Sequence, residues 1–334
     1  MSSLQCDFCW HQCVLSEGKT GICGIRKHTG NSLVTLGFGE VVASGVDPIE
    51  KKPMYHFLPG RKTFSFALFG CNYTCRFCQN HRISQTDSPS WPGRTGHSTP
   101  NPTTPRKLVD MMERSGCQIM SYTYSEPLVW QDYMLEVATL VRDKGKLNCM
   151  VTNGSFSPRA LQRILGVIDA FNIDVKGDDR FYREYCGGAL QPVLDAVETI
   201  AARRDTVLEV TTLLIEGIHT ERMVKTLARQ LADRGVQVWH LSRFFPHYRM
   251  TALPQTSEGF LEEMLLIAEA VGIPHVYAGN SALYAWEKTV CPACHKTLIH
   301  SHSYAGEAFN EIQQNIPGGV CVICGQHIYG RFNV

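Results

Sequence analysis

The sequence predicts an α/β fold with a mostly parallel sheet and a small cysteine-rich segment at each end of the chain. From residue 106 onward, helix-like segments alternate with short apolar segments of strand length, which is typical of parallel sheets. Cysteines gather at both ends and directly after the first apolar strand. We therefore expect three regions: an N-terminal cysteine-rich region over 1–60, an α/β domain over 61–287 and a four-cysteine segment over 288–334.

The central domain begins with an apolar run of β type, Phe64 to Phe69, which Gly70 ends. Residues 84–105 are rich in Ser, Pro, Thr and Gly and predict a loop. Helices and strands then alternate. In chain order we expect helix 106–114, strand 118–124, helix 128–144, strand 147–152, helix 158–165, strand 167–175, helix 191–204, strand 206–215, helix 221–234, strand 236–241, helix 257–271 and strand 274–277.

Composition limits the function classes. The 334 residues are 44% apolar and 19% charged, and the net charge of +1 gives no field for attracting nucleic acid or an anionic membrane. No stretch approaches the length of a membrane span, and the N-terminus has no apolar secretory core. We expect a cytoplasmic protein that binds neither membrane nor nucleic acid. Most of its fourteen cysteines are then expected to bind metal and not to form disulfides.

Three thiols, Cys71, Cys75 and Cys78, lie within eight residues directly after the first strand. Thiolates in so short a loop can all reach one 4Fe–4S cube, which has four irons, so one iron lacks a local protein ligand. An open coordination position is what a catalytic metal needs. A structural zinc loop or a set of unrelated thiols is the alternative, but zinc sites usually pair two Cys-x-x-Cys units. The loop therefore favours a catalytic iron–sulfur cluster.

Further candidate site residues follow the other strands, because active groups of parallel sheets lie at the carboxyl ends of the strands. Glu126 could accept a hydrogen bond from the ammonium of an amino-acid-like ligand, or cap the helix that begins at Pro127. Asp174 and Lys176 share one face of a strand, where the lysine can meet an anionic group or simply pair with the aspartate. The full set is Glu126, Thr152, Asn153, Asp174, Lys176 and Arg243, the last for an anionic ligand group.

The cysteines near the C-terminus form two thiolate knuckles with the spacing of a zinc ribbon. Four thiolates close the coordination shell, and a rubredoxin-type iron would use the same ligands. This set is Cys291, Cys294, Cys321 and Cys324.

A second set, Cys6, Cys9, Cys13 and Cys23, lies at the N-terminus. Zinc and an auxiliary iron–sulfur cluster both fit these four thiols, in a structural or electron-relaying role. Zinc is slightly favoured, because the segment lacks the Cys-Pro ending common in ferredoxin-type loops. The remaining cysteines, Cys117, Cys149 and Cys186, stand alone and are expected to be small buried hydrophobes.

The spacing of the central cysteines, with Phe77 before the third, resembles the signature of the radical S-adenosylmethionine (SAM) enzymes. The resemblance implies a partial (β/α)6-type barrel in which the open iron chelates SAM and its reduction yields a 5′-deoxyadenosyl radical. Glu126-Pro127 resembles the turn that holds the SAM amine in activating enzymes, with Tyr124 and Ser125 in place of two glycines. Residues 151–154 and the Asp174–Lys176 pair resemble segments of glycyl-radical-enzyme activases, where the pair lies beside the SAM carboxylate.

A narrower resemblance covers nearly the whole chain. Residues 47–60, 70–72, 78–80, 126–127, 151–154 and 276–280 resemble the radical SAM member of the AmmeMemoRadiSam system, which is related to pyruvate-formate-lyase activating enzymes. It implies an activase-like oxidoreductase with a polypeptide as hydrogen donor, a flavodoxin- or ferredoxin-like electron donor and a Memo-like partner. The alternatives are radical modification of a small metabolite or nucleotide, and a non-catalytic iron–sulfur and zinc scaffold for the Memo-like partner.

Overall fold

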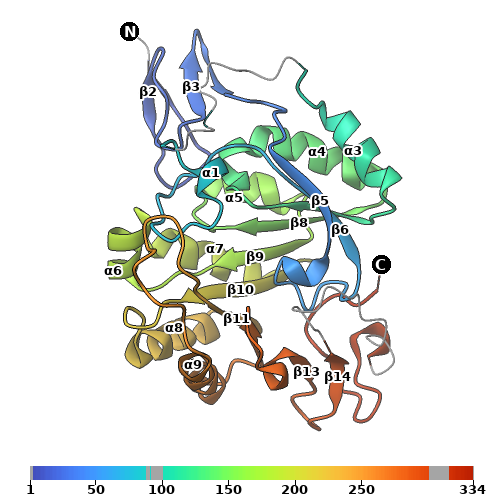
Figure 1. Ribbon diagram of the computed structural model, residues 1–334. Helices are drawn as coiled ribbons and strands as arrows, with labels where there is room; N and C mark the ends of the chain where they lie inside the picture. The colour runs from blue at the N-terminus through green and yellow to red at the C-terminus, as the bar shows by residue number, and fades with distance from the viewer. Residues whose placement is uncertain (1–2, 88–90, 92–100, 301–315, 334) are drawn as a thin grey trace.

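The computed structural model describes residues 3–87, 91, 101–300 and 316–333, and its centre is an eight-stranded sheet (Figure 1). Strands β6 to β12 are parallel and lie side by side in chain order, and β5 pairs antiparallel with β6 at one edge. The expected α/β fold with a mostly parallel sheet is confirmed. The strands are β5 (Ala43–Pro48), β6 (Lys62–Ala67), β7 (Ile119–Tyr122), β8 (Leu147–Thr152), β9 (Ala170–Asp174), β10 (Val207–Leu214), β11 (Val238–Arg243) and β12 (His275–Gly279).

Helices connect the parallel strands and pack against the sheet. Several begin with a side-chain cap: Ser157 accepts from the Ala160 N–H, and Ser257 accepts from the Phe260 N–H. No helix in the described part of the chain is long and apolar enough to cross a membrane. The helices are α1 (His81–Ser84), α3 (Pro105–Arg114), α4 (Gln131–Asp143), α5 (Pro158–Leu165), α6 (Asp179–Phe181), α7 (Gln191–Ala201), α8 (Glu221–Asp233) and α9 (Glu258–Val271).

The structure adds elements that the sequence pattern does not show. Strand β5 contains Gly45 and ends in Pro48, so only its pairing with β6 makes it a strand. A 3-10 turn, η2 (Pro127–Trp130), precedes α4, and a π-helical turn, η3 (Tyr182–Cys186), follows α6. Most of the loop expected over 84–105, namely 88–90 and 92–100, lies outside the described residues.

The N-terminal region consists of two hairpins, β1 (Ser3–Gln5) with β2 (Val14–Ser16) and β3 (Arg26–Thr29) with β4 (Ser32–Thr35). The Trp10 N–H donates to the Ser155 carbonyl at 3.0 Å, after strand β8. Two ion pairs add to this contact, Arg26 with Asp132 at 2.7 Å and Arg163 with Asp7 at 2.8 Å. The hairpins therefore dock at the carboxyl ends of the strands.

Residues 49–58, which we call the plug, fill the opposite end of the sheet and include the 3-10 turn η1 (Ile49–Lys51). Their buried side chains, among them Met54 and Phe57, pack on the first residues of β7 to β10. The Glu209 carboxylate of β10 accepts the backbone N–H groups of Tyr55 at 3.0 Å and His56 at 2.8 Å. The plug thus closes the amino ends of the strands and leaves their carboxyl ends open.

The C-terminal segment docks on the plug. Its elements are η4 (Tyr284–Glu287), β13 (Lys288–Val290), β14 (Thr297–His300) and η5 (Pro317–Gly319). The Leu58 N–H donates to the Arg331 carbonyl at 2.7 Å, and the Arg331 N–H donates to the His56 carbonyl at 2.8 Å. Figure 1 shows this segment beside η1, far from the N-terminal hairpins. The two cysteine-rich ends therefore lie at opposite ends of the sheet.

We expect Gly154→Ala to destabilise the protein. Gly154 follows β8 with a φ of +71°, and an added Cβ would lie 2.7 Å from Ile173 Cγ2. The strained backbone and the overpacking together should cost about 1–3 kcal/mol. The matched control is Gly166→Ala, because Gly166 has a φ of −72° and an added Cβ would make only an ordinary contact of 3.7 Å with the Arg163 carbonyl oxygen. A thermal melt compares the two variants, and equal melting temperatures would contradict this account of Gly154.

Candidate functional site

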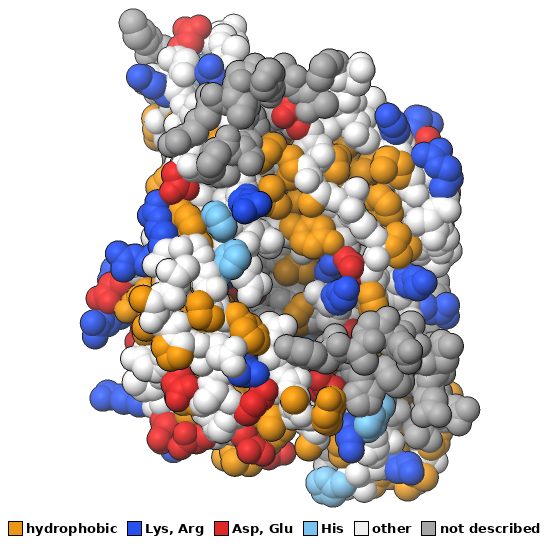
Figure 2. All heavy atoms as spheres, viewed as in Figure 1, with side chains coloured by type: hydrophobic (Ala, Val, Ile, Leu, Met, Phe, Trp, Pro, Cys, Tyr) orange, Lys and Arg blue, Asp and Glu red, His pale blue; other side chains and the backbone are white. Residues whose placement is uncertain are grey.

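A cavity of about 260 Å³ opens at the carboxyl ends of the parallel strands. Figure 2 shows this face of the molecule hollowed near its centre. The cavity is lined by the cysteine loop after β6 and by residues that follow the neighbouring strands. Those from the expected set are Cys71, Cys75, Cys78, Glu126, Asn153, Asp174 and Lys176. The structure therefore brings seven of the expected residues to one place.

The cysteine loop is held from both sides. The Thr74 N–H donates to the Cys186 carbonyl at 2.8 Å, so the π-helical turn η3 supports the loop beneath Cys75. The Cys78 sulfur lies 3.2 Å from the Ser84 hydroxyl of α1. The Cys71 sulfur accepts from the Tyr73 N–H at 3.4 Å. These contacts fix three thiols around one cavity without joining them to one another.

Glu126 is buried at the edge of the cavity, and three protein donors orient its carboxylate. Oε1 accepts from the Thr152 hydroxyl at 2.6 Å and from the Leu128 N–H at 3.1 Å, and Oε2 accepts from the Asn153 N–H at 2.8 Å. Burial raises the pKa of Glu126 to about 7, although these hydrogen bonds act to lower it. A carboxylate has about four acceptor positions, so this one has room for a further donor from the cavity.

Asp174 and Lys176 point to the same side of the chain, as the period of a strand predicts, and form an ion pair of 2.7 Å. Burial acts to lower the pKa of Lys176. The charge of Asp174 and the thiols of Cys75 and Cys186 outweigh it, so the pKa lies well above the usual lysine value. The positively charged Lys176 side chain therefore lies beside the cysteine loop.

Two expected residues do not line the cavity. Thr152 contacts it only through Glu126, whose carboxylate it orients. Arg243 ends β11, but its guanidinium donates to the Thr256 carbonyl at 2.7 Å and pairs with Glu258 at 2.5 Å. Glu258 begins α9, so the helix start and not the cavity holds this arginine.

Sequence reasoning missed Cys186 as a neighbour of the cysteine loop. Its carbonyl accepts the Thr74 N–H at 2.8 Å, and the interaction with its thiol lowers the pKa of Cys75. Cys186 is fully buried, as expected of a lone cysteine, but it is not merely a small hydrophobe. No local motif could have signalled it, because η3 meets the loop only in the folded chain.

Sequence reasoning also missed a second cavity of about 540 Å³, which adjoins the first. The two share lining residues, among them Tyr124 and Thr211. On the far side lie Asp47 and the buried Lys52, whose ion pair measures 2.9 Å. The Tyr124 hydroxyl donates to Asp47 at 2.8 Å, and Tyr124 has a φ of +67°, a backbone strain typical of functional sites. The buried Thr211 hydroxyl has no hydrogen-bond partner within the described residues.

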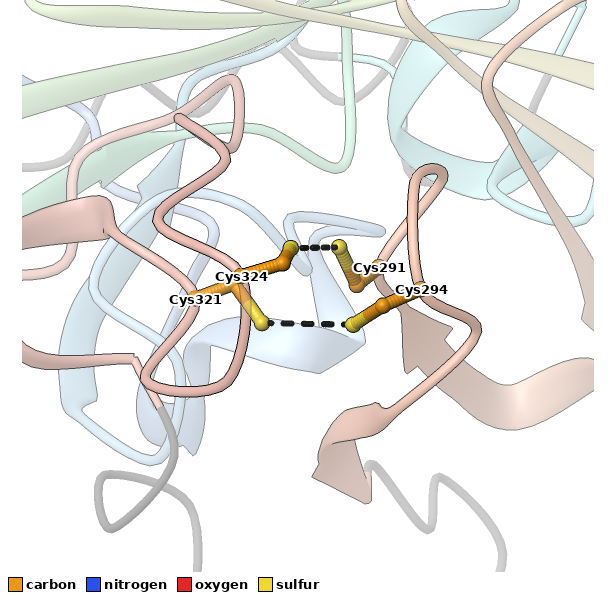
Figure 3. A group of neighbouring side chains, drawn as sticks. All are labelled: Cys291, Cys294, Cys321 and Cys324. Carbon is orange, nitrogen blue, oxygen red and sulfur yellow. Dashed lines mark hydrogen bonds between the residues drawn. The ribbon is translucent and has the colours of Figure 1, made fainter.

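The C-terminal cysteines converge on one point (Figure 3). Their four sulfur atoms lie within 4.8 Å of one another, and Cys291–Cys324 and Cys294–Cys321 are each separated by 3.6 Å. A single tetrahedral ion with metal–sulfur bonds of about 2.3 Å would hold its ligands about 3.8 Å apart. The expected four-thiolate site is therefore supported by its geometry.

The two C-terminal knuckles share one backbone design. The His295 N–H donates to the Cys291 carbonyl and the Gly325 N–H to the Cys321 carbonyl, both at 2.9 Å. His295 and Gly325, each directly after the second cysteine of its knuckle, have φ values of 58° and 75°. Backbone N–H groups from Cys324 and Ile323 hold the pKa of Cys321 below its usual range. Burial and the hydrogen bonds with neighbouring thiols raise the pKa values of Cys294 and Cys324, so an ion that binds here would displace protons from these two thiols.

Comparison with known proteins agrees with this geometry. Residues 67–231 match the radical SAM superfamily. Uncharacterized protein MJ0808 of Methanocaldococcus jannaschii is 33% identical over 331 residues, which are 98% of this chain and 95% of that protein. Streptococcus suis SuiB bound to S-adenosylmethionine has a TM-score of 0.50 at 8% identity, over 73% of this chain and 56% of that chain. A domain of pyruvate-formate lyase-activating enzyme from Bacteroides vulgatus has a TM-score of 0.42 at 17% identity, over 48% of this chain and 98% of that chain.

The chain belongs to the same family as MJ0808, and its residues 67–231 form a radical SAM domain. Such a domain implies a 4Fe–4S cluster and SAM, and the donor set fits both. Three cysteine thiols surround the first cavity and leave a fourth iron without a protein ligand. The Glu126 carboxyl group and the Lys176 ammonium line the same cavity. They suit, respectively, the ammonium and the carboxylate of an amino acid.

We expect the C-terminal site to hold about one zinc ion per chain, which survives exposure to air because a closed zinc site has no redox chemistry. Cys324→Ser should lose this ion, whereas Cys117→Ser, at a lone buried cysteine, should keep it. Metal analysis of protein purified in air measures both. Iron in place of zinc would reassign the ion, and the absence of any tightly held metal would contradict the site.

Proposed function

We propose that the protein is a radical SAM enzyme that cleaves SAM in the first cavity and acts on a substrate bound in the second. The observation that carries the proposal is the adjoining pair of cavities at the carboxyl ends of the strands. When bound, the cluster would supply the electron that splits the SAM sulfonium to a 5′-deoxyadenosyl radical, which abstracts hydrogen from the substrate. The chain's own residues hold the reactants and exclude water.

Each end of the amino-acid part of SAM has a candidate partner. Glu126 is oriented by Thr152 and by the Asn153 N–H, and it retains an acceptor position for the SAM ammonium. Lys176 remains charged and faces the cavity, where it can attract the SAM carboxylate, and Asp174 fixes its position. Asn153 lines the same cavity, with its side-chain nitrogen 3.9 Å from the Cys71 sulfur. Arg243 has no part in this arrangement.

The second cavity favours a small polar substrate. Its volume falls within the range of about 300–1,000 Å³ typical of small-molecule sites. Asp47, Lys52 and the Tyr124 hydroxyl line it, and the Thr211 hydroxyl has an unused hydrogen-bonding capacity. A buried ion pair is costly unless further groups satisfy it, so these residues suit a ligand with polar groups of its own. A polypeptide donor, which the activase resemblance favours, would present a glycyl backbone and would need no such charges.

Residues 47–60, which resemble the AmmeMemoRadiSam group, support assignment to that group. Within residues 47–60, Asp47 and Lys52 line the second cavity, and the plug closes the opposite end of the sheet. The motif therefore shapes the proposed substrate site. On this assignment the electron donor is a flavodoxin- or ferredoxin-like protein, and a Memo-like protein is a partner.

Lys176→Ala should weaken SAM binding and leave the iron content unchanged, because the lysine is assigned to the SAM carboxylate and not to iron. Losing one charge-assisted contact costs about 1.5–3 kcal/mol, or roughly ten- to over a hundred-fold in affinity. Lys144→Ala is the control, since Lys144 also forms an ion pair of 2.7 Å, with Glu113 on the surface. Calorimetric titration with SAM measures both. Unchanged SAM affinity combined with reduced thermal stability would make Lys176 a structural residue.

The substrate proposal predicts that small molecules stimulate SAM cleavage. Reduced, reconstituted protein is incubated with SAM and with cell extract separated into low-mass and macromolecular fractions, and 5′-deoxyadenosine is measured. We expect the low-mass fraction to stimulate the wild type and not Lys52→Ala. The control, Lys62→Ala, changes an exposed lysine at the start of β6 and should respond like the wild type. Stimulation by the macromolecular fraction alone would favour the polypeptide substrate.

A further inference from the structure

The four N-terminal cysteines come from two parts of the chain, the β1–β2 connection with Cys6, Cys9 and Cys13 and a following turn with Cys23. Cys6 and Cys13 face each other where the β1–β2 pairing continues, and the Cys6 N–H donates to the Cys13 carbonyl at 2.9 Å. Cys23 lies in the turn in which the Gly24 N–H donates to the Gly21 carbonyl at 2.9 Å. A Cβ added at Gly21 would lie 3.7 Å from the Cys13 sulfur, so this turn passes directly over Cys13.

Three of these thiols are buried. Cys6, Cys9 and Cys23 are 6%, 7% and 5% exposed, Cys13 is partly exposed, and none of the four forms a disulfide. Four free thiols gathered in this way suit a metal centre.

The spacing distinguishes this set from the C-terminal one. The described residues include all four N-terminal cysteines. Among these residues, the C-terminal set is the only group of three or more His, Cys, Asp or Glu side chains whose ligand atoms all lie within 4.8 Å of one another. No three of the N-terminal sulfur atoms come that close, and neither do those of Cys71, Cys75 and Cys78. Each thiolate of a four-iron cluster binds a different iron, so a cluster spaces its ligands more widely than one ion does. The N-terminal set, like the three cysteines of the central loop, is therefore less compact than the single-ion site at the C-terminus.

We infer that Cys6, Cys9, Cys13 and Cys23 hold a second 4Fe–4S cluster, which passes electrons to the catalytic one. Four thiolates saturate its four irons, so it has no open position for SAM. This inference replaces the zinc that the sequence favoured for these cysteines. The presence of the cluster is independent of the proposed function, whereas its electron-passing role depends on SAM cleavage at the first cavity.

The contacts between the two sites define the route. The His11 ring, two residues after Cys9, lies 3.1 Å from the carbonyl oxygen of Asn72, which directly follows Cys71. The Asn72 side chain donates to the Ser155 hydroxyl at 2.8 Å, and the Ser155 carbonyl accepts the Trp10 N–H at 3.0 Å. The loop that carries Cys9 therefore contacts the residue that adjoins a cysteine of the central loop.

The electron balance requires an external donor. A reduced flavodoxin- or ferredoxin-like protein gives one electron to the N-terminal cluster and is itself oxidised by one electron. That electron passes to the catalytic cluster, so the N-terminal cluster returns to its oxidised state. SAM cleavage consumes the electron, since the sulfonium is reduced as its bond to the 5′-carbon breaks.

Metal analysis of anaerobically reconstituted protein tests the inference. The wild type should hold about eight irons per chain, four for each cluster, and one zinc ion. The triple variant Cys71→Ala, Cys75→Ala, Cys78→Ala should retain about four irons, with an electron paramagnetic resonance signal that SAM does not change. Four irons and two zinc ions in the wild type would overturn the inference, and so would a triple variant without iron that melts like the wild type.

A second variant tests the electron route. Cys6→Ser, Cys9→Ser should hold about four irons in a catalytic site whose reduced signal still responds to SAM. Flavodoxin should reduce the catalytic cluster of this variant severalfold more slowly than that of the wild type. Dithionite, a small reagent, should reduce both at the same rate. The control, Cys117→Ser, should be reduced at the wild-type rate by both. If flavodoxin reduces the variant and the wild type at equal rates, the electron route is rejected. The presence of the second cluster would then rest on the iron count alone.

Discussion

The buried carboxylate of Glu209 holds the architecture together. A charge at the centre of a sheet is costly unless donors surround it, and here two backbone N–H groups of the plug and the His240 ring at 2.7 Å do so. Because the plug is fixed to β10 and β11 in this way, the amino ends of the strands are closed. The C-terminal segment then docks on the plug, and Tyr329 accepts from the Leu208 N–H at 2.6 Å, one residue before Glu209.

Closing one end of the sheet leaves the other for chemistry. Seven parallel strands bring their carboxyl ends to one edge, where the cysteine loop, Glu126 and the Asp174–Lys176 pair meet around a cavity. Lys52 of the plug lines the second cavity, which adjoins the first. The two terminal cysteine sets are separated accordingly. One docks beside the cysteine loop, where the proposed second cluster would pass electrons, and the other lies on the plug, where the proposed closed metal site would stabilise the fold.

Local patterns made much of this predictable. The spacing of Cys71, Cys75 and Cys78 and the strand period of Asp174 and Lys176 are short-range features, and both appear in the structure as expected. The spacing of the C-terminal knuckles likewise anticipated their convergence. Contacts between distant segments could not be foreseen: Cys186 reaches Cys75 through a π-helical turn, and β5 exists only through its partner strand. Arg243 ends a strand as expected, but Glu258 at the next helix start binds it.

The central claim is that the three-cysteine loop makes this protein a catalyst of SAM cleavage and not a metal-containing scaffold. The most direct measurement is the yield of 5′-deoxyadenosine and methionine from SAM by reduced, iron-loaded protein. The account predicts equal amounts of both products from the wild type and none from Cys75→Ala, because two thiolates cannot hold the cluster with one open iron. A wild type that carries its full iron and forms neither product would contradict the account, as would product formation by Cys75→Ala at the wild-type rate.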